Sequence, residues 1–208
     1  MVVEAVAVGK RLAAAWGAWI CFEDEAGQTL RPSKARTWGR RGHTPIVTVS
    51  GKGSGRVSIA GLVCAKEGHR GRLVFRTILH RGRKGERRSF AETDYIALLD
   101  AAHKTLGAPL VVVWDNLNVH VSARMRAFIE ARDWLTVIRL PAYAPDLNPT
   151  EGVWSHLKRG LGNLAATGID DLATTMRSRL RNIQNQPDLI AGFIAQTGMT
   201  LEPEPLRC

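Results

Sequence analysis

Three acidic residues, far apart in the sequence, have the side-chain type and the positions needed to hold divalent metal ions. They are Asp24, Asp115 and Glu151. Asp24 comes just after the apolar run 18–22, and Asp115 directly follows the apolar run 110–114. Reactive groups in open α/β sheets gather outside the carboxyl ends of the strands, so we expect these acids to converge. Hard carboxylate oxygens of this kind suit Mg²⁺ or Mn²⁺ better than zinc.

Glu151 has two interpretations. Asn148 is a good N-cap, Pro149 is favoured as the first helical residue, and Glu151 stands at the third position, as in a capping box. However, Glu151 also lies three residues before Trp154, on the face of a helical stripe that continues at Leu157, Leu161 and Leu164. A carboxylate at the mouth of a buried stripe needs a partner such as a metal ion. This stretch alone favours neither the helix cap nor the metal ligand. The presence of the other two acids favours the interpretation of Glu151 as a metal ligand.

The charge balance indicates what such an acidic cluster would act on. The chain of 208 residues has 29 Lys and Arg against 19 Asp and Glu, a net charge of +10 and an isoelectric point near 10.3. This excess favours a polyanionic partner, with nucleic acid first, although a basic protein from an arginine-rich proteome would look similar. Paired divalent ions can activate water and stabilise the leaving oxygen of a phosphodiester.

Basic segments are expected to hold the backbone of a nucleic acid. One segment covers residues 31–42, and another is the expected loop at residues 80–88, which holds five Lys and Arg. The alternative for the second segment is a solvated hairpin tip. The residues predicted to contact DNA are Arg36, Arg40, Arg41, Arg81, Arg83, Lys84, Arg87, Arg88 and Lys158.

The order of the elements predicts an α/β protein with a mixed sheet flanked by helices. We expect strands at residues 18–22, 45–49, 57–63, 72–79, 110–114 and 135–140. We expect helices at residues 90–106, 121–132 and 188–197, and from residues 149 and 170 onward; residues 1–15 form a helix or a frayed lead-in. Three widely spaced cysteines suggest neither a disulfide framework nor a zinc site, and no segment has a signal-peptide layout. The protein is therefore expected to be intracellular.

The motifs around these acids resemble those of the DDE transposases of the mariner-like superfamily, in particular its bacterial insertion-sequence branch. The most specific motif contains proline, tyrosine, asparagine and the final acid in register. The matching stretches span about residues 18 to 164 and are Phe22–Gly27, Arg36–Pro45, Val113–Asn116 with His120, and Leu140–Glu151 followed by Trp154 and Lys158.

The resemblance implies an RNase H-like catalytic domain at residues 18–165, after a lead-in at 1–17 and before a helical extension and loose tail at 166–208. It implies that Asp24, Asp115 and Glu151 bind Mg²⁺ or Mn²⁺, with two ions expected. Asp146 is a competing third acid but a poorer ligand. Glu25, Asn116 and His120 are expected to support the ligands, although His120 could equally be an ordinary histidine at a helix start. We expect the tryptophans Trp38 and Trp154 to lie in the core.

The same resemblance implies DNA strand cleavage followed by strand transfer from a 3′-hydroxyl. The expected partners are double-stranded DNA at element ends and target, a second copy in a homodimer, and a helix-turn-helix half encoded upstream, because few residues precede Asp24. The expected location is the bacterial cytoplasm, at the nucleoid. Two alternatives stay open: a non-catalytic DNA-binding or assembly remnant of a split transposase, and an RNase H-like nuclease.

Overall fold

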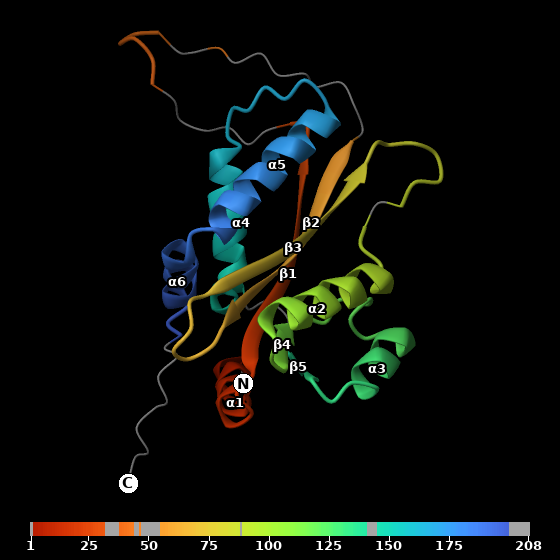
Figure 1. The fold of residues 1–208 in the computed structure, drawn as a ribbon. Helices are drawn as coiled ribbons and strands as arrows, with labels where there is room; N and C mark the ends of the chain where they lie inside the picture. Colours follow the sequence, from red (N-terminus) through yellow and green to blue (C-terminus); the bar gives the residue numbers. More distant parts are fainter. Residues whose placement is uncertain are drawn as a thin grey trace.

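A five-stranded mixed sheet runs through the centre of the molecule in the order β3-β2-β1-β4-β5 (Figure 1). The computed structural model describes residues 2–31, 38–43, 46, 55–87, 89–140 and 145–199. Strands β1, β2 and β3 pair antiparallel, while β4 and β5 extend the other edge of β1 in parallel, which confirms the predicted mixed sheet. The strands are β1 Trp19–Thr29, β2 Arg56–Ala65, β3 Arg72–His80, β4 Leu110–Trp114 and β5 Leu135–Arg139.

Strand β1 extends through the acids at which the sequence predicted its end. That prediction is wrong because β2 pairs with β1 from Ile20 to Thr29, so the antiparallel ladder continues past the acidic residues. The parallel pairing with β4 stops earlier, at Phe22 opposite Val113. Asp24 therefore lies inside a strand, but just beyond the carboxyl end of its parallel neighbour.

Helices cover both faces of the sheet (Figure 1). Helices α1, α4, α5 and α6 pack on the face that carries Ile20 and Phe22, whereas α2 and α3 pack on the face that carries Trp19 and Cys21. The predicted alternation of side chains along β1 is thus confirmed. The helices are α1 Val2–Ala15, α2 Glu92–Leu106, α3 Ala123–Glu130, α4 Pro149–Gly160, α5 Ile169–Gln184 and α6 Pro187–Gln196, with a short 3-10 helix η1 at Pro145–Leu147.

The predicted helices are confirmed, and local capping residues explain their ends. Ser122 caps α3 by accepting a hydrogen bond from the Met125 amide, and α2 ends at Gly107, whose φ of 62° suits glycine. Residues 1–15, which the sequence left open, form helix α1 from residue 2. The strand predicted at residues 45–49 lies outside the described residues apart from Ile46, which has no regular structure. None of the helices in the described ranges has the length and apolar character that crossing a membrane requires.

Candidate active site

The N-terminus of α4 is attached to the middle of β1 by side-chain hydrogen bonds. Asn148 Nδ2 donates to the carbonyl oxygen of Glu23 at 2.9 Å, and Thr150 Oγ1 donates to that of Phe22 at 2.7 Å. Asn148 Oδ1 accepts from the Thr150 amide at 3.1 Å, which confirms the predicted N-cap. Across the described residues, Glu151 makes no reciprocal side-chain bond to the Asn148 amide, so its carboxylate is not used in a capping box. These bonds place Glu151 beside β1.

Asp24 lies next to Glu151 on the face of the sheet that α4 covers. Trp154 Nε1 donates to Asp24 Oδ2 at 2.9 Å. The pKa of Asp24 is raised to about 7. Burial is the largest cause, the nearby charge of Glu151 is the second, and the charge of Asp115 makes a smaller contribution. The hydrogen bonds from the Glu25 amide and Trp154 act in the opposite direction. The Asp24 carboxyl is thus held in a position where negative charge is unfavourable unless a cation joins it.

Asp115 follows β4, and its carboxylate contacts the buried ring of His120. The Asp115 Oδ1 atom lies 3.1 Å from His120 Nδ1 and accepts a hydrogen bond from the Leu117 amide at 3.1 Å. Partial burial raises the pKa of Asp115, but these two hydrogen bonds outweigh it and leave the pKa below its ordinary value. The side chain is 52% exposed, so it is accessible from solvent.

The other two acids of β1 point to the opposite face of the sheet. Glu25 accepts a hydrogen bond from the Tyr95 hydroxyl of α2 at 2.9 Å. Glu23 is only 2% exposed, and its Oε2 atom lies 3.4 Å from His120 Nε2. Burial raises the pKa of Glu23 well above its ordinary value, and the charges of Asp24, Asp115 and Glu25 add to this effect. Glu23 is not among the site residues predicted from the sequence, although the alternation of side chains along β1 places it on the same face as buried Cys21.

The side chains of Asn116 and Asp146 have no described contact with Asp24, Asp115 or Glu151. Asn116 Nδ2 donates to the carbonyl oxygen of Leu140 at 3.0 Å, so it joins the ends of β4 and β5. Among the described contacts it has none with the Asp115 side chain. Asp146 lies exposed in η1. The surroundings of Glu25, Asn116 and His120 therefore differ in kind: among the described contacts, the His120 side chain touches Asp115, whereas Glu25 touches Asp24 through its backbone amide.

No three His, Cys, Asp or Glu side chains within the described ranges lie close enough together to bind one metal ion. The electrostatic interactions instead rank the pairs: Asp24 interacts with Glu151 more strongly than with Asp115. Both other acids thus lie near enough for their charges to raise the pKa of Asp24, and the effect of Glu151 is the larger one. Their assignment as metal ligands stays a prediction.

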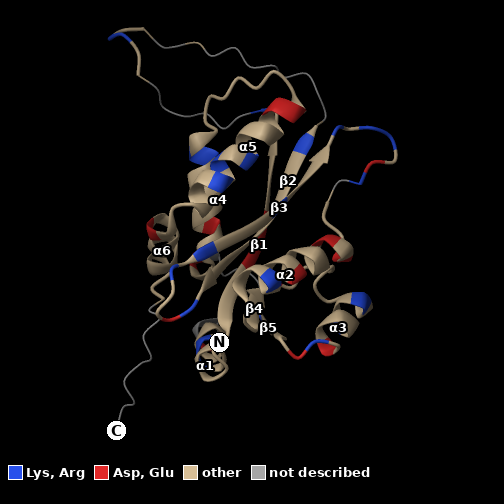
Figure 2. Ribbon diagram, in the orientation of Figure 1, with Lys and Arg blue, Asp and Glu red and all other residues tan. Residues whose placement is uncertain are grey.

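The basic residues predicted to contact DNA fall into two groups. Arg81 forms an ion pair with Asp170 at 2.6 Å, and Arg87 with Asp94 at 2.7 Å. Glu86 accepts hydrogen bonds from the amides of Arg81 and Arg83 at 2.7 and 3.2 Å, which shapes the loop after β3 (Figure 2). The exposed cations for which the described residues provide no ion pair are Arg40, Arg41, Arg83, Lys84 and Lys158, while Arg36 and Arg88 lie outside the described residues.

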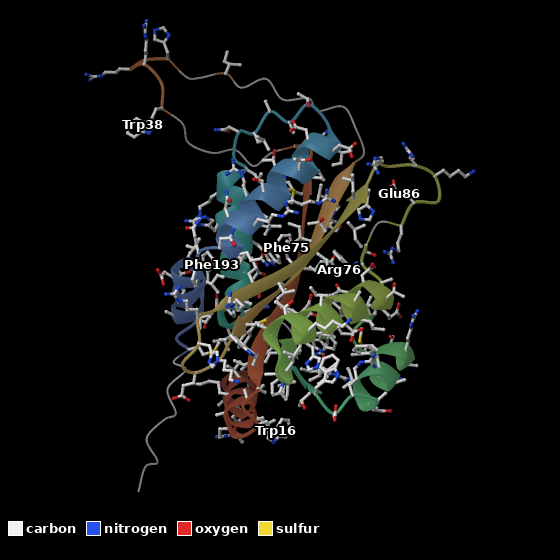
Figure 3. The ribbon with its side chains drawn as sticks, in the orientation of Figure 1. Trp16, Trp38, Phe75, Arg76, Glu86 and Phe193 are labelled. Carbon is white, nitrogen blue, oxygen red and sulfur yellow. The ribbon has the colours of Figure 1, made fainter. Side chains whose placement is uncertain are left out.

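The two tryptophans expected in the core have different surroundings. Trp154 is 1% exposed, which confirms that prediction, although its indole nitrogen also contacts Asp24. Trp38 is fully exposed, so the prediction for it is wrong (Figure 3). It stands beside Gly39 and Arg40, and none of the described helices and strands covers its ring (Figure 3).

Comparisons with known proteins agree with this geometry. A model of the DDE superfamily endonuclease family matches residues 19–173. The Tc1 transposase of Caenorhabditis elegans is 33% identical over 69 residues, which cover 33% of this chain and 25% of that protein. The chain therefore spans only a quarter of the length of that curated relative.

Solved structures of similar fold cover nearly the whole chain. The Mos1 transposase paired-end complex with left transposon end matches with a TM-score of 0.60 and 14% identity over 97% of this chain and 62% of that one. The catalytic domain of Mos1 mariner transposase matches with a TM-score of 0.53 and 15% identity over 95% of this chain and 92% of that one. The chain belongs to the DDE superfamily endonuclease family, and its mixed sheet has the RNase H-like fold of the mariner-type catalytic domain.

Proposed function

We propose that this chain is the catalytic part of a transposase that cuts a DNA strand at the end of a mobile element and joins the freed 3′-hydroxyl to target DNA. The observation that carries the proposal is the half-buried pair of Asp24 and Glu151, together with Asp115, whose charge also acts on Asp24. Both reaction steps are in-line displacements at phosphorus, for which catalysis consists mainly of positioning and charge stabilisation.

The donor set fits a divalent cation. Burial and, next, the nearby charge of Glu151 raise the pKa of Asp24 to about 7, and a cation held by these acids would favour their ionised forms. We propose that Asp24, Asp115 and Glu151 hold Mg²⁺ or Mn²⁺, with two ions in the working complex. Bound ions of this kind supply an activated water and stabilise the leaving oxygen of a phosphodiester.

The remaining residues of the site would hold the acids and the DNA. Trp154 fixes one oxygen of Asp24, and His120 fixes one oxygen of Asp115. Lys158 stands one helical turn after Trp154 and faces Ala26 and Gln28 of β1. A cation there would meet the phosphate backbone next to the cut.

The partners follow from this chemistry. We propose that the substrate is double-stranded DNA, consistent with Mos1 structures that contain a transposon end. Joining two element ends to one target requires two active sites, so we propose a homodimer in the working complex. We also propose that a helix-turn-helix half recognises the ends, since this chain covers 62% of the Mos1 transposase that it matches. Assignment to the bacterial insertion-sequence branch, and a place at the nucleoid, belong to the same proposal.

The test is strand cleavage and joining by the full chain on DNA carrying the element ends, with Mg²⁺ or Mn²⁺. Asp115→Asn, Asp24→Asn and Glu151→Gln should each lose activity, while the control Asp146→Asn, an exposed acid five residues before Glu151, should keep it. Equal activity in wild type and Asp115→Asn would contradict the proposal.

One observation favours a second candidate, a DNA-binding remnant without catalytic activity. The three acids are not close enough in the described structure to share one ion. For such a remnant, DNA would bind in a salt-dependent manner, but neither cleavage nor joining would appear even after addition of an end-binding half. Preference for an RNA–DNA hybrid over duplex DNA would instead identify an RNase H-like nuclease.

A further inference from the structure

A buried pair of polar side chains lies beneath Asp115, on the face of the sheet opposite Asp24. His120 is fully buried and Glu23 is 2% exposed. Glu23 Oε2 lies 3.4 Å from His120 Nε2, and on the other side of the ring His120 Nδ1 lies 3.1 Å from Asp115 Oδ1. One imidazole ring therefore connects a carboxylate of the core to a carboxylate of the candidate active site.

The ring is held in this orientation by its aromatic neighbours. It stacks on Trp114 with ring centroids 4.3 Å apart and an interplanar angle of 5°, and it meets the edge of Tyr95 at 4.8 Å and 83°. Tyr95 is itself fixed by its hydrogen bond to Glu25. A half-turn of the imidazole would replace both nitrogens by carbon atoms at the two carboxylates. The contact with Asp115 therefore depends on which edge of the ring faces Glu23.

Glu23 has no evident role in the stability of the fold. A buried carboxyl group is unfavourable unless it is paired, and apolar replacements of buried charged pairs are often neutral or stabilising. Within the described residues, the Oε1 atom of Glu23 and the Nε2 atom of His120 have no hydrogen-bond partner, and the 3.4 Å contact between Glu23 Oε2 and His120 Nε2 is the ion-pair contact that the Glu23 side chain makes. An acid at this position is thus explained by what it does to His120.

We propose that Glu23 is a positioning residue of the active site: through its contact with Nε2 it holds the His120 ring so that Nδ1 faces Asp115. The inference rests on the proposed function, in which Asp115 is a catalytic acid. It assigns different tasks to the two neighbours of Asp24. Glu23 orients the ring behind Asp115, while Glu25 is hydrogen-bonded to α2 through Tyr95.

The test compares Glu23→Ala, Glu23→Gln and the control Ser58→Ala. Ser58 is also buried, also faces α2 and also has no hydrogen-bond partner among the described residues, but it does not touch His120. Glu23→Ala should lower the cleavage rate at saturating DNA about 10- to 100-fold, the effect typical of residues that orient a ligand, with DNA affinity unchanged. Glu23→Gln keeps a polar side chain of the same size beside Nε2 and should recover most of the rate, and Ser58→Ala should match wild type.

A double-mutant cycle makes the test decisive. If Glu23 acts through His120, Glu23→Ala should have no further effect in a His120→Ala background. Additive losses would overturn the proposal, as would a Glu23→Ala protein as active as wild type. Circular dichroism and thermal unfolding identify any variant that fails to fold, in which case the isosteric Glu23→Gln carries the comparison.

A measurement that does not need activity separates this inference from the proposed function. Ring ¹⁵N signals of His120, recorded at fixed pH, report the protonation pattern of the ring, that is, which ring nitrogen carries a proton. These signals should be the same in wild type and Glu23→Gln, and they should differ in Glu23→Ala. If the pattern changes but wild type cuts no DNA, the positioning contact stands and the proposed function fails. If wild type cuts DNA and the pattern is the same in all variants, the positioning role is wrong.

Discussion

The indole nitrogen of Trp154 lies 2.9 Å from the Oδ2 atom of Asp24, so helix α4 contacts the first predicted catalytic acid directly. Residue Trp154 is otherwise part of the core, with 1% of its surface exposed, and its ring lies over Gly61 of β2. The same side chain therefore packs α4 on the sheet and fixes one oxygen of Asp24. Changes in the packing of Trp154 should therefore alter the position and the pKa of Asp24.

Replacing Trp154 by phenylalanine should raise the pKa of Asp24 above its value of about 7, because the lost N–H donor favours the ionised carboxylate. Most of the ring packing would remain, so the free energy of unfolding should fall by only about 1–3 kcal/mol, the range for a hydrogen bond to a charged group. The measurement is a ¹³C NMR titration of the Asp24 carboxyl without metal. A pKa that stays the same or falls would contradict the role assigned to this bond.

The raised pKa of Asp24 should make the metal-free protein more stable as the pH falls. The folded-state pKa of about 7 lies above the ordinary value, so between that value and pH 7 the folded state binds more protons than the unfolded state. Stability from this group is fully present at low pH and is lost as the pH rises toward 7. Thermal unfolding of wild type and Asp24→Asn between pH 4 and 7 checks this: the difference between them should shrink or reverse as the pH falls. A difference independent of pH would exclude it.

Gly61→Ala should disturb the site through Trp154. A Cβ atom at Gly61 would lie 2.9 Å from the Trp154 ring, so the ring must move. Overpacking of this kind typically costs about 1–3 kcal/mol, and we also expect slower DNA cleavage because the ring carries the donor to Asp24. The control is Gly192→Ala in α6, where no atom lies within 4 Å of the new Cβ atom and where alanine favours a helix. Equal behaviour of both variants in denaturant unfolding would argue against this coupling.

The substitution Asn148→Asp should keep the helix cap of α4 and remove the hydrogen bond that attaches α4 to β1. Aspartate still accepts from the Thr150 amide, but it cannot donate to the Glu23 carbonyl as Asn148 Nδ2 does at 2.9 Å. We expect a loss of about 1–3 kcal/mol from the unpaired buried carbonyl, together with reduced cleavage because Glu151 is no longer held beside β1. Asn148→Ala, which also removes the cap, should be less stable by about another 1 kcal/mol. If Asn148→Asp is as stable and active as wild type, the attachment does not position Glu151.

The loop after β3 should bind DNA mainly through the cations that have no acidic partner. Arg83→Ala and Lys84→Ala should each weaken DNA binding and lower the salt dependence by about one phosphate contact. Arg87→Ala should have a smaller effect, because Arg87 is paired with Asp94 at 2.7 Å. Fluorescence anisotropy with duplex DNA over a series of salt concentrations measures both quantities. Equal slopes for all three variants would show that the ion pair does not matter.

Several features of the site could be predicted from the sequence because they depend on short-range patterns. The cap at Asn148 and the buried strand 110–114 follow from local residue preferences, and the alternation along β1 follows from the pleat. The end of β1 could not be predicted this way. Three consecutive acids resemble a strand exit, but pairing with β2 extends the strand to Thr29.

The exposure of Trp38 and the pairing of the loop cations also depended on long-range contacts. A tryptophan between basic residues carries no local signal that tells whether another element will cover it. Arg81 finds its acid in α5, 89 residues away along the chain, so its sequence neighbours say nothing about that ion pair. Charge composition predicts a basic surface but not which cations remain free to bind phosphate.

The sequence by itself determined the three acids, the helix cap and the family motifs, because each is a pattern of a few residues in a row. Only the tertiary structure decided which of these groups meet. Asn148 bonds to β1 across 125 residues and Trp154 reaches Asp24 across 130, and no local preference contains such a contact. It likewise decided that Glu23, rather than Glu25, faces the histidine behind Asp115, because both acids share one face of the strand and only the packing of α2 and the β4–α3 connection distinguishes them.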